Sequence, residues 1–236
     1  MGKNLIQQRR GRGSLRFRAP AHHFYGRAEY PKMEGELKGT IKEILHCPAH
    51  TAPLMGVEYS NGQSILMITP ENAKVGNEIF SGKTAPIENG NVLPLGSIIE
   101  GTSIFNLESR PGDGGKFVRS GGNSAKVVAK TESSVSVLLP SKKIKEFNPD
   151  CRATIGTIAG AGRLEKPLMK AGTAFFKVRQ KNKFWPNVCG QSMNAVAHPH
   201  GGKRSSKKNY SLISSRDAPP GAKVGKISPR RTGRKR

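Results

Sequence analysis

Two histidines, His198 and His200, are the side chains of this 236-residue chain whose type and spacing are closest to a chemical site. Imidazole can bind a metal ion or transfer a proton near neutral pH. A metal site would need a third ligand at a plausible spacing, and none is nearby, while Pro199 stiffens the pair. Acid–base catalysis would need a partner, but Ala197 precedes His198. We therefore predict no metal site and no catalytic residue, and favour contact with RNA.

A glycine-rich basic loop over residues 110–123 superficially resembles a nucleotide phosphate loop. Its sequence, RPGDGGKFVRSGGN, departs from GxxxxGK[ST] because Phe117 follows Lys116. The loop also lies between predicted strands and does not open a helix, so we reject a mononucleotide site. Bare backbone amides flanked by Arg110, Lys116 and Arg119 would suit a folded RNA backbone, and a flexible turn is the alternative.

Arginines also alternate with glycines near the N-terminus. An arginine side chain can bind a phosphate through two parallel hydrogen bonds, and glycine lets the backbone come close. Three nearby aromatic side chains, Phe17, Phe24 and Tyr25, could stack on unpaired bases. With the loop and the histidine segment, these arginines complete the set of candidate RNA-binding residues. The set is Arg9, Arg10, Arg12, Arg16, Arg18, Arg110, Lys116, Arg119, Asn194, His198, His200, Lys203 and Arg204.

The positive charge of the chain is unevenly distributed along its length. Lysine and arginine number 40 against 16 acidic residues, for a net charge of +24. Residues 1–35 hold 8 basic and 2 acidic residues, residues 36–110 hold 5 and 8, residues 111–198 hold 15 and 5, and residues 199–236 hold 12 and 1. Basic ends poor in apolar residues are typical of tails that become ordered on a polyanion, although they could also be merely solvated.

The cysteines and the hydropathy of the chain limit the classes of protein to which it could belong. Cys47, Cys151 and Cys189 form no CxxC pair and are odd in number, so we expect neither structural zinc nor a disulfide framework. No stretch approaches the roughly 20 apolar residues that span a membrane, and the N-terminus lacks a signal-peptide core. We expect a cytoplasmic protein.

The elements that would position these residues read mainly as short β-strands. Residues 39–46 form one apolar strand, and residues 54–70 form a hairpin whose Asn61-Gly62 dipeptide tolerates the positive φ of a tight turn. Residues 74–79 resemble another strand. Several short strands separated by turn residues predict a small barrel.

A second β region follows the turn-forming residues 90–96. Residues 97–108 predict one or two strands, residues 125–141 a second hairpin and residues 151–160 a further strand, whereas residues 162–172 are the best candidate for a short helix. The predicted architecture is two small β barrels in series with extended basic tails. Its parts are an N-terminal extension (1–35), a first domain (36–85), a second domain (86–195) and a C-terminal extension (196–236).

Taken together, these motifs resemble the universal large-subunit ribosomal protein two family nearly end to end. The resemblance rests on the early Arg-Gly-Arg-Gly segment, GNVLPLGSIIEGTSIFNLE, RPGDGGKFVRSGG, CRATIG and, above all, MNAVAHPHGGKR. The length and the short basic tail after Gly202 are similar to the archaeal and eukaryotic branch. In the bacterial pattern an aspartate commonly precedes the first histidine, where this chain has Ala197, and this departure weakens any proton-relay role for His198.

The resemblance implies an OB-fold barrel followed by an SH3-like barrel, which agrees with the two-barrel prediction. It implies a structural constituent of the large ribosomal subunit that binds its rRNA directly and is not an enzyme. It also implies neighbouring ribosomal proteins, a small-subunit contact at an intersubunit bridge, and support for the architecture around the peptidyl-transferase centre during translation. No cofactor is expected; Mg²⁺ or K⁺ could bridge protein and RNA, but no residue cluster demands an ion.

Two other classes compete with this reading. A nucleic-acid-modifying enzyme would need a cofactor loop or a clustered acid–base pair, and the sparse acids fall mostly in residues 36–110, away from the histidines. A DNA-packing protein would predict long basic helices, whereas glycine and proline interrupt these tails. Both are less consistent with the sequence than an RNA-binding scaffold.

Overall fold

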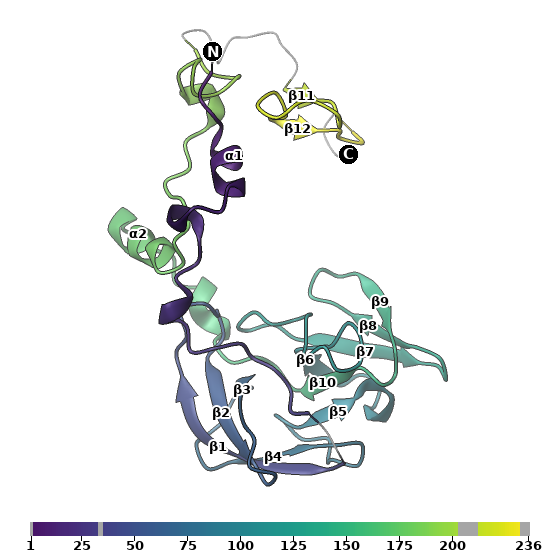
Figure 1. Ribbon diagram of the computed structural model, residues 1–236. Helices are drawn as coiled ribbons and strands as arrows, with labels where there is room; N and C mark the ends of the chain where they lie inside the picture. The colour runs from purple at the N-terminus through teal and green to yellow at the C-terminus, as the bar shows by residue number, and fades with distance from the viewer. Residues whose placement is uncertain (1, 33–34, 203–211, 232–236) are drawn as a thin grey trace. The chain divides into compact units, whose positions relative to one another are not determined.

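The computed structural model describes residues 2–32, 35–202 and 212–231 and divides into two compact units (Figure 1). We call Ala21–Leu168 the β unit, and Met1–Pro20 together with Met169–Arg236 the terminal unit. Strands dominate and helices are short, which confirms the mainly-β prediction. Among the residues described, no helix combines the length and apolar content needed to cross a membrane.

The first half of the β unit is built from β1 (Leu37–Leu45), β2 (Leu54–Tyr59), β3 (Ser64–Ile68) and β4 (Glu78–Ser81). β1 begins with alternating buried and exposed residues, the period-two pattern of a strand with one face in the core. β2 and β3 pair antiparallel, and Gly62 has a φ of 78° in the turn between them. The predicted Asn-Gly hairpin is therefore confirmed.

The second half continues the same sheet. Its strands are β5 (Val92–Pro94), β6 (Ser103–Phe105), β7 (Ala125–Lys130), β8 (Val135–Leu138), β9 (Ile144–Phe147) and β10 (Arg152–Ile155). The strand order is β3-β2-β1-β4-β5-β10-β6-β7-β8-β9, and Figure 1 shows the early strands on one side of the unit and β6–β9 on the other. β7 and β8 form the second predicted hairpin, which is also confirmed.

The two halves of the β unit also share buried side chains. Leu54 and Ile68 from the first half pack in one cluster with Phe105 and Ile158 from the second. The β4–β5 pair, Ser81 with Val92, crosses the predicted boundary at residues 85/86. The halves therefore form one packed body, and the position of the domain boundary within it stays a prediction.

The terminal unit contains short helices and almost no core. Its elements are α1 (Ile6–Gly11), η1 (Leu15–Phe17), α2 (Ala171–Arg179), η5 (Gly190–Ser192), β11 (Ile213–Ser214) and β12 (Lys226–Ile227), the last two paired in parallel. Within the described part of this unit, only Leu5 and Val224 are buried hydrophobic residues. The N-terminal extension is thus not wholly extended, but its helical turns bury nothing.

Two predicted elements were misplaced. The helix expected at residues 162–172 is wrong: a short 3₁₀ turn, η4 (Ala161–Leu164), is followed by irregular chain, and α2 starts only at Ala171. Pro167 explains the break, because proline lacks an amide donor and disfavours helical backbone at the residue before it. The strand expected at residues 74–79 is a turn until Glu78, with Gly76 at a φ of 90°.

Strand length was overestimated in the second half. Of residues 97–108, only Ser103–Phe105 are strand, after η3 (Leu95–Ser97). Another 3₁₀ turn, η2 (Ala21–His23), opens the β unit.

Cys47 and Cys151 are buried core residues with free thiols, and Cys189 is an exposed free thiol.

Candidate nucleic-acid interface

The positive charge of the chain is concentrated in the terminal unit. That unit holds 23 basic residues and one acid, Asp217, for a net charge of +22. The β unit holds 17 basic and 15 acidic residues, for a net charge of +2. The domain boundaries predicted from the sequence place residues 169–183, which include five basic residues, in the second β domain. The fold instead joins them to the N-terminal arginines.

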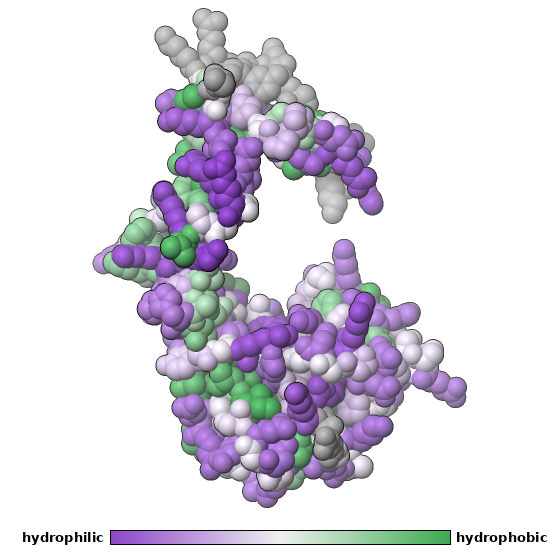
Figure 2. Space-filling view, viewed as in Figure 1, coloured by the Kyte–Doolittle hydropathy of each residue, from purple (hydrophilic) through white to green (hydrophobic). Residues whose placement is uncertain are grey.

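A unit of this composition cannot be stabilised by its own packing. Self-repulsion opposes its compact state, and two buried hydrophobic residues offset little of it. Figure 2 shows hydrophilic side chains over most of its visible surface, with scattered hydrophobic ones between them. A surface of this kind matches a polyanion that neutralises the charge and covers the exposed apolar groups.

The predicted N-terminal arginines are all exposed. Arg9 and Arg10 lie in the last turn of α1, where a cation also interacts favourably with the negative end of the helix dipole. The Arg18 Nε donates to the Gly13 carbonyl oxygen at 2.7 Å, which folds the Gly-Ser turn back on itself. Arg12 and Arg16 complete this exposed row, so phosphates could approach each member.

The glycine-rich loop differs from the prediction in one important way, because its amides are not bare. The Asp113 carboxylate accepts hydrogen bonds from the amides of Ser109, Arg110 and Gly115 at 3.0–3.3 Å. Glu108 accepts from the amides of Gly112 and Gly114. The expectation that these amides are bare is therefore wrong, since two carboxylates of the chain accept hydrogen bonds from them, while contact of the loop with RNA stays a prediction.

Glu108 is the centre of a buried ion pair that holds the loop to the sheet. Its carboxylate is fully buried and lies 2.7 Å from the Arg152 guanidinium, and it also accepts from the Arg152 backbone amide at 2.9 Å. The same guanidinium donates to the Pro31 carbonyl at 2.7 Å and packs over the Tyr30 ring. Burial raises the pKa of the Tyr30 phenol, whose oxygen donates to the Asn106 carbonyl at 2.7 Å. This network fixes the loop internally.

The fixed loop presents two cations outward and uses a third internally. Arg110 and Lys116 are exposed. Arg119 instead donates from its guanidinium to the carbonyl oxygens of Gly115 and Ala28, each at 2.9 Å, and burial lowers its pKa. Arg119 therefore has a structural role in the β unit, and its contact with RNA stays a prediction.

The two predicted histidines lie together in a tight turn. The His200 amide donates to the His198 Nδ1 at 3.0 Å, and the two rings are 5.1 Å apart between centroids. The Asn194 carbonyl begins the turn by accepting from the His198 amide, and a Cβ at Gly190 would collide with the His198 ring. Burial, and secondarily the His200 imidazole, lowers the pKa of His198.

A neutral imidazole that accepts at Nδ1 carries its proton on Nε2, so His198 offers a hydrogen-bond donor at that atom. A donor in a rigid turn suits a phosphate or base oxygen. Within the described residues, no three histidine, cysteine or acidic side chains are placed to hold a metal ion. Lys203 and Arg204, predicted to contact RNA after this turn, lie outside the described residues.

Sequence reasoning missed the residues around α2. Arg179 and Lys183 line one pocket with Phe175, Phe184 and Trp185, and the N-terminal Arg16 lines it as well. Two signals were available: no acidic residue occurs between Glu165 and Asp217, and aromatic residues are unusually dense from 175 to 185. Neither signal predicts that Leu15 and Asn182, 167 positions apart, come together, because that contact is formed only by the fold.

Comparison with known proteins matches both halves of the chain. The family model described as "Ribosomal Proteins L2, RNA binding N-terminal domain" matches residues 2–81, and "Ribosomal Proteins L2, C-terminal domain" matches residues 88–220. Proteins named "Large ribosomal subunit protein uL2" are similar over the full length. That of Methanothermobacter thermautotrophicus is 46% identical, with all of both chains covered. That of Sulfolobus acidocaldarius is 47% identical, with 100% of this chain and 99% of the relative covered.

Proposed function

The chain belongs to the ribosomal protein L2 family, and we propose that its terminal unit is the principal element by which it holds ribosomal RNA. Members of this family are structural ribosomal proteins and not enzymes. The chain is accordingly a structural constituent of the large ribosomal subunit that binds its rRNA, and its place in the cell is the ribosome in the cytoplasm.

The observation that carries this proposal is the +22 net charge of a unit whose described part buries only two hydrophobic residues. Each phosphate neutralised by lysine or arginine releases condensed counterions, which favours binding at low salt. Arg9, Arg10, Arg12, Arg16 and Arg18 would bind phosphates on one segment. The turn with Asn194, His198 and His200, followed by Lys203 and Arg204, would bind on another. Nucleic acid then covers the apolar side chains that the unit leaves exposed.

The β unit would contribute a rigid shape to RNA binding more than it contributes positive charge. Its net charge is +2, and its glycine-rich loop is held rigid by Glu108 and Asp113. Arg110 and Lys116 project from that rigid loop, so they would contact phosphates at fixed positions and set the register of the protein on the RNA. Affinity would come mainly from the terminal unit and orientation from the β unit.

The family resemblance supports three finer assignments. They are contact with neighbouring ribosomal proteins, a contact with the small subunit at an intersubunit bridge, and support for the RNA architecture around the peptidyl-transferase centre. In the last assignment the chain would act as a scaffold, as expected of a family whose members are structural ribosomal proteins.

A competition titration tests the function directly. Labelled large-subunit rRNA is bound to the full chain on filters over a range of salt, with excess unrelated structured RNA or duplex DNA as competitor. We expect specific binding that neither competitor abolishes, with an affinity that falls steeply as salt rises. Equal displacement by every polyanion would show that only the charge, and not the fold, recognises RNA.

A further inference from the structure

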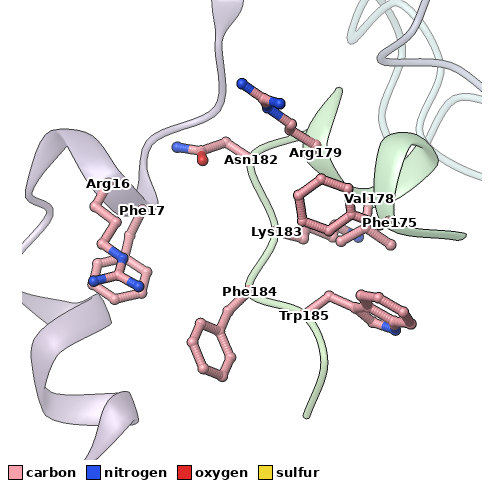
Figure 3. Close-up of a pocket in the computed structure, with 9 residues that line it drawn as sticks. All are labelled: Arg16, Phe17, Phe175, Val178, Arg179, Asn182, Lys183, Phe184 and Trp185. Atoms are coloured by element: carbon pink, nitrogen blue, oxygen red, sulfur yellow. The ribbon is translucent and has the colours of Figure 1, made fainter. Parts of the chain in front are cut away.

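An aromatic pocket lies in the terminal unit between the N-terminal segment and the chain after α2 (Figure 3). Its cavity is about 220 Å³, and four of its lining side chains are aromatic: Phe17, Phe175, Phe184 and Trp185. In the view of Figure 3, Phe17 and Phe184 lie on one side of the opening, and Phe175 and Trp185 on the other. The pocket thus offers aromatic rings from two segments that are far apart in sequence.

The pocket is fastened by side-chain hydrogen bonds. The Asn182 amide nitrogen donates to the carbonyl oxygens of Leu15 at 3.2 Å and Arg18 at 2.8 Å, which ties η1 to the loop after α2. Asn182 itself has a φ of 47°, a left-handed conformation that asparagine tolerates better than most residues. Its backbone amide donates to the Arg179 carbonyl at 2.8 Å, so the loop turns sharply at the end of the helix. These contacts hold the two walls in place.

The aromatic rings are only partly used by the protein itself. Phe175 and Trp185 lie 6.4 Å apart between ring centroids at a tilt of 55°, too far and too inclined for full stacking on each other. Phe175 is 42% exposed and Phe184 is 36% exposed. Ring faces therefore remain open to an incoming planar group.

The rim of the pocket is positive and has no acid among its lining residues. Arg16, Arg179 and Lys183 contribute three cations. Ring faces for a flat group and cations for an anion, within one site, are the combination that single-stranded nucleic acid requires, because each nucleotide carries a base and a phosphate. The cavity is smaller than the roughly 300–1,000 Å³ of sites for drug-sized molecules, which favours one ring over a larger cofactor.

We propose that this pocket receives one unstacked nucleobase of the large-subunit rRNA, with the adjoining phosphates held by Arg16, Arg179 and Lys183. This inference rests on the proposed function, because it takes the bound RNA as the source of the base. Stacking tolerates any base, so the pocket selects an unpaired position in the RNA fold and not a sequence. It would lock the terminal unit onto one point of the RNA, which charge alone cannot do.

The chain provides its own probe, because Trp185 is its only tryptophan. Stacking of a base on an indole ring quenches its fluorescence. When the full chain is titrated with large-subunit rRNA, we expect Trp185 emission to fall in step with the binding measured on filters. Duplex DNA, whose bases stay stacked, should leave the emission largely unchanged.

Substitutions separate stacking from charge. Trp185→Leu should weaken rRNA binding by about tenfold or more with an unchanged salt slope, and Trp185→Phe should restore most of the affinity. Arg179→Gln should lower the salt slope by about one ion while the tryptophan is still quenched. Val188→Ala is the control for Phe175→Leu: Val188 is an exposed apolar residue of the same unit outside the pocket, and its loss should change little, whereas Phe176 packs edge-to-face on Phe175 and would not be neutral.

The outcomes of these experiments distinguish a failure of the base-pocket proposal from a failure of the proposed rRNA-binding function. Specific rRNA binding without quenching of Trp185, or quenching only after other ribosomal proteins are added, would overturn the base pocket and leave RNA binding intact. Failure of specific rRNA binding itself would overturn the proposed function. If Trp185→Leu does not fold, two measurements still test the base pocket. They are the Trp185 emission of the unsubstituted chain on addition of rRNA and the salt dependence of rRNA binding by Arg179→Gln.

Discussion

Replacing Glu108 by glutamine is expected to lower the free energy of unfolding of the chain by about 3–5 kcal/mol. The substitution keeps the shape of the side chain but removes the charge opposite Arg152, whose guanidinium is only 13% exposed. It also weakens the acceptor for the amides of Gly112 and Gly114. A buried cation without its partner is costly, and here the loop that presents Arg110 and Lys116 would loosen as well.

Urea denaturation followed by far-UV circular dichroism measures this effect. Glu58→Gln is the matched control, because Glu58 pairs with Lys42 at 3.0 Å while both side chains are more than half exposed. An exposed pair contributes less than about 1 kcal/mol, so the control should unfold nearly as the unsubstituted chain does. Equal losses for the two variants would mean that the Glu108–Arg152 pair does not organise the sheet and loop.

Changing Arg9, Arg10, Arg12, Arg16 and Arg18 together to glutamine is expected to weaken binding to large-subunit rRNA by about a hundredfold or more near physiological salt. All five guanidinium groups are exposed in a unit that buries almost nothing, so their charge is available to phosphates. The dependence of the logarithm of affinity on the logarithm of salt concentration should fall by about four, since each neutralised phosphate contributes roughly 0.7–0.9.

A control of equal charge uses five exposed lysines of the β unit: Lys74, Lys83, Lys126, Lys142 and Lys143. Their replacement by glutamine removes the same net charge from a unit that starts near +2. We expect a much smaller loss of affinity and of salt slope than for the arginines. Matching losses would show that total charge, and not its place in the terminal unit, determines binding.

Local signals in the sequence predicted the parts of the fold that depend on neighbouring residues. Asn61-Gly62 predicts its hairpin because only a few residue types adopt the positive φ that the turn needs. The period-two pattern of Val135 and Val137 likewise predicts β8, whose inner face is buried. The mainly-β class follows from several such signals in succession.

Features that depend on distant residues were not predictable in this way. The amides of the glycine-rich loop are bonded by Glu108 and Asp113, and nothing in the local pattern indicates that these carboxylates turn inward. Arg119 resembles a free cation in sequence but donates to the Ala28 carbonyl across the fold. The aromatic pocket needs Asn182 to hold the Arg18 carbonyl, a pairing that only the folded chain reveals.

If rRNA completes the packing that the terminal unit lacks, amide hydrogen exchange in that unit should slow when the RNA binds. The full chain is compared alone and bound to large-subunit rRNA. We expect α1 and α2, which bury no residue, to exchange quickly in the free chain and to slow by about tenfold or more on the RNA. The strands of the β unit should be protected in both states. Equal protection of α1 and α2 with and without RNA, or protection confined to the β unit, would show that the RNA does not complete the packing of the terminal unit.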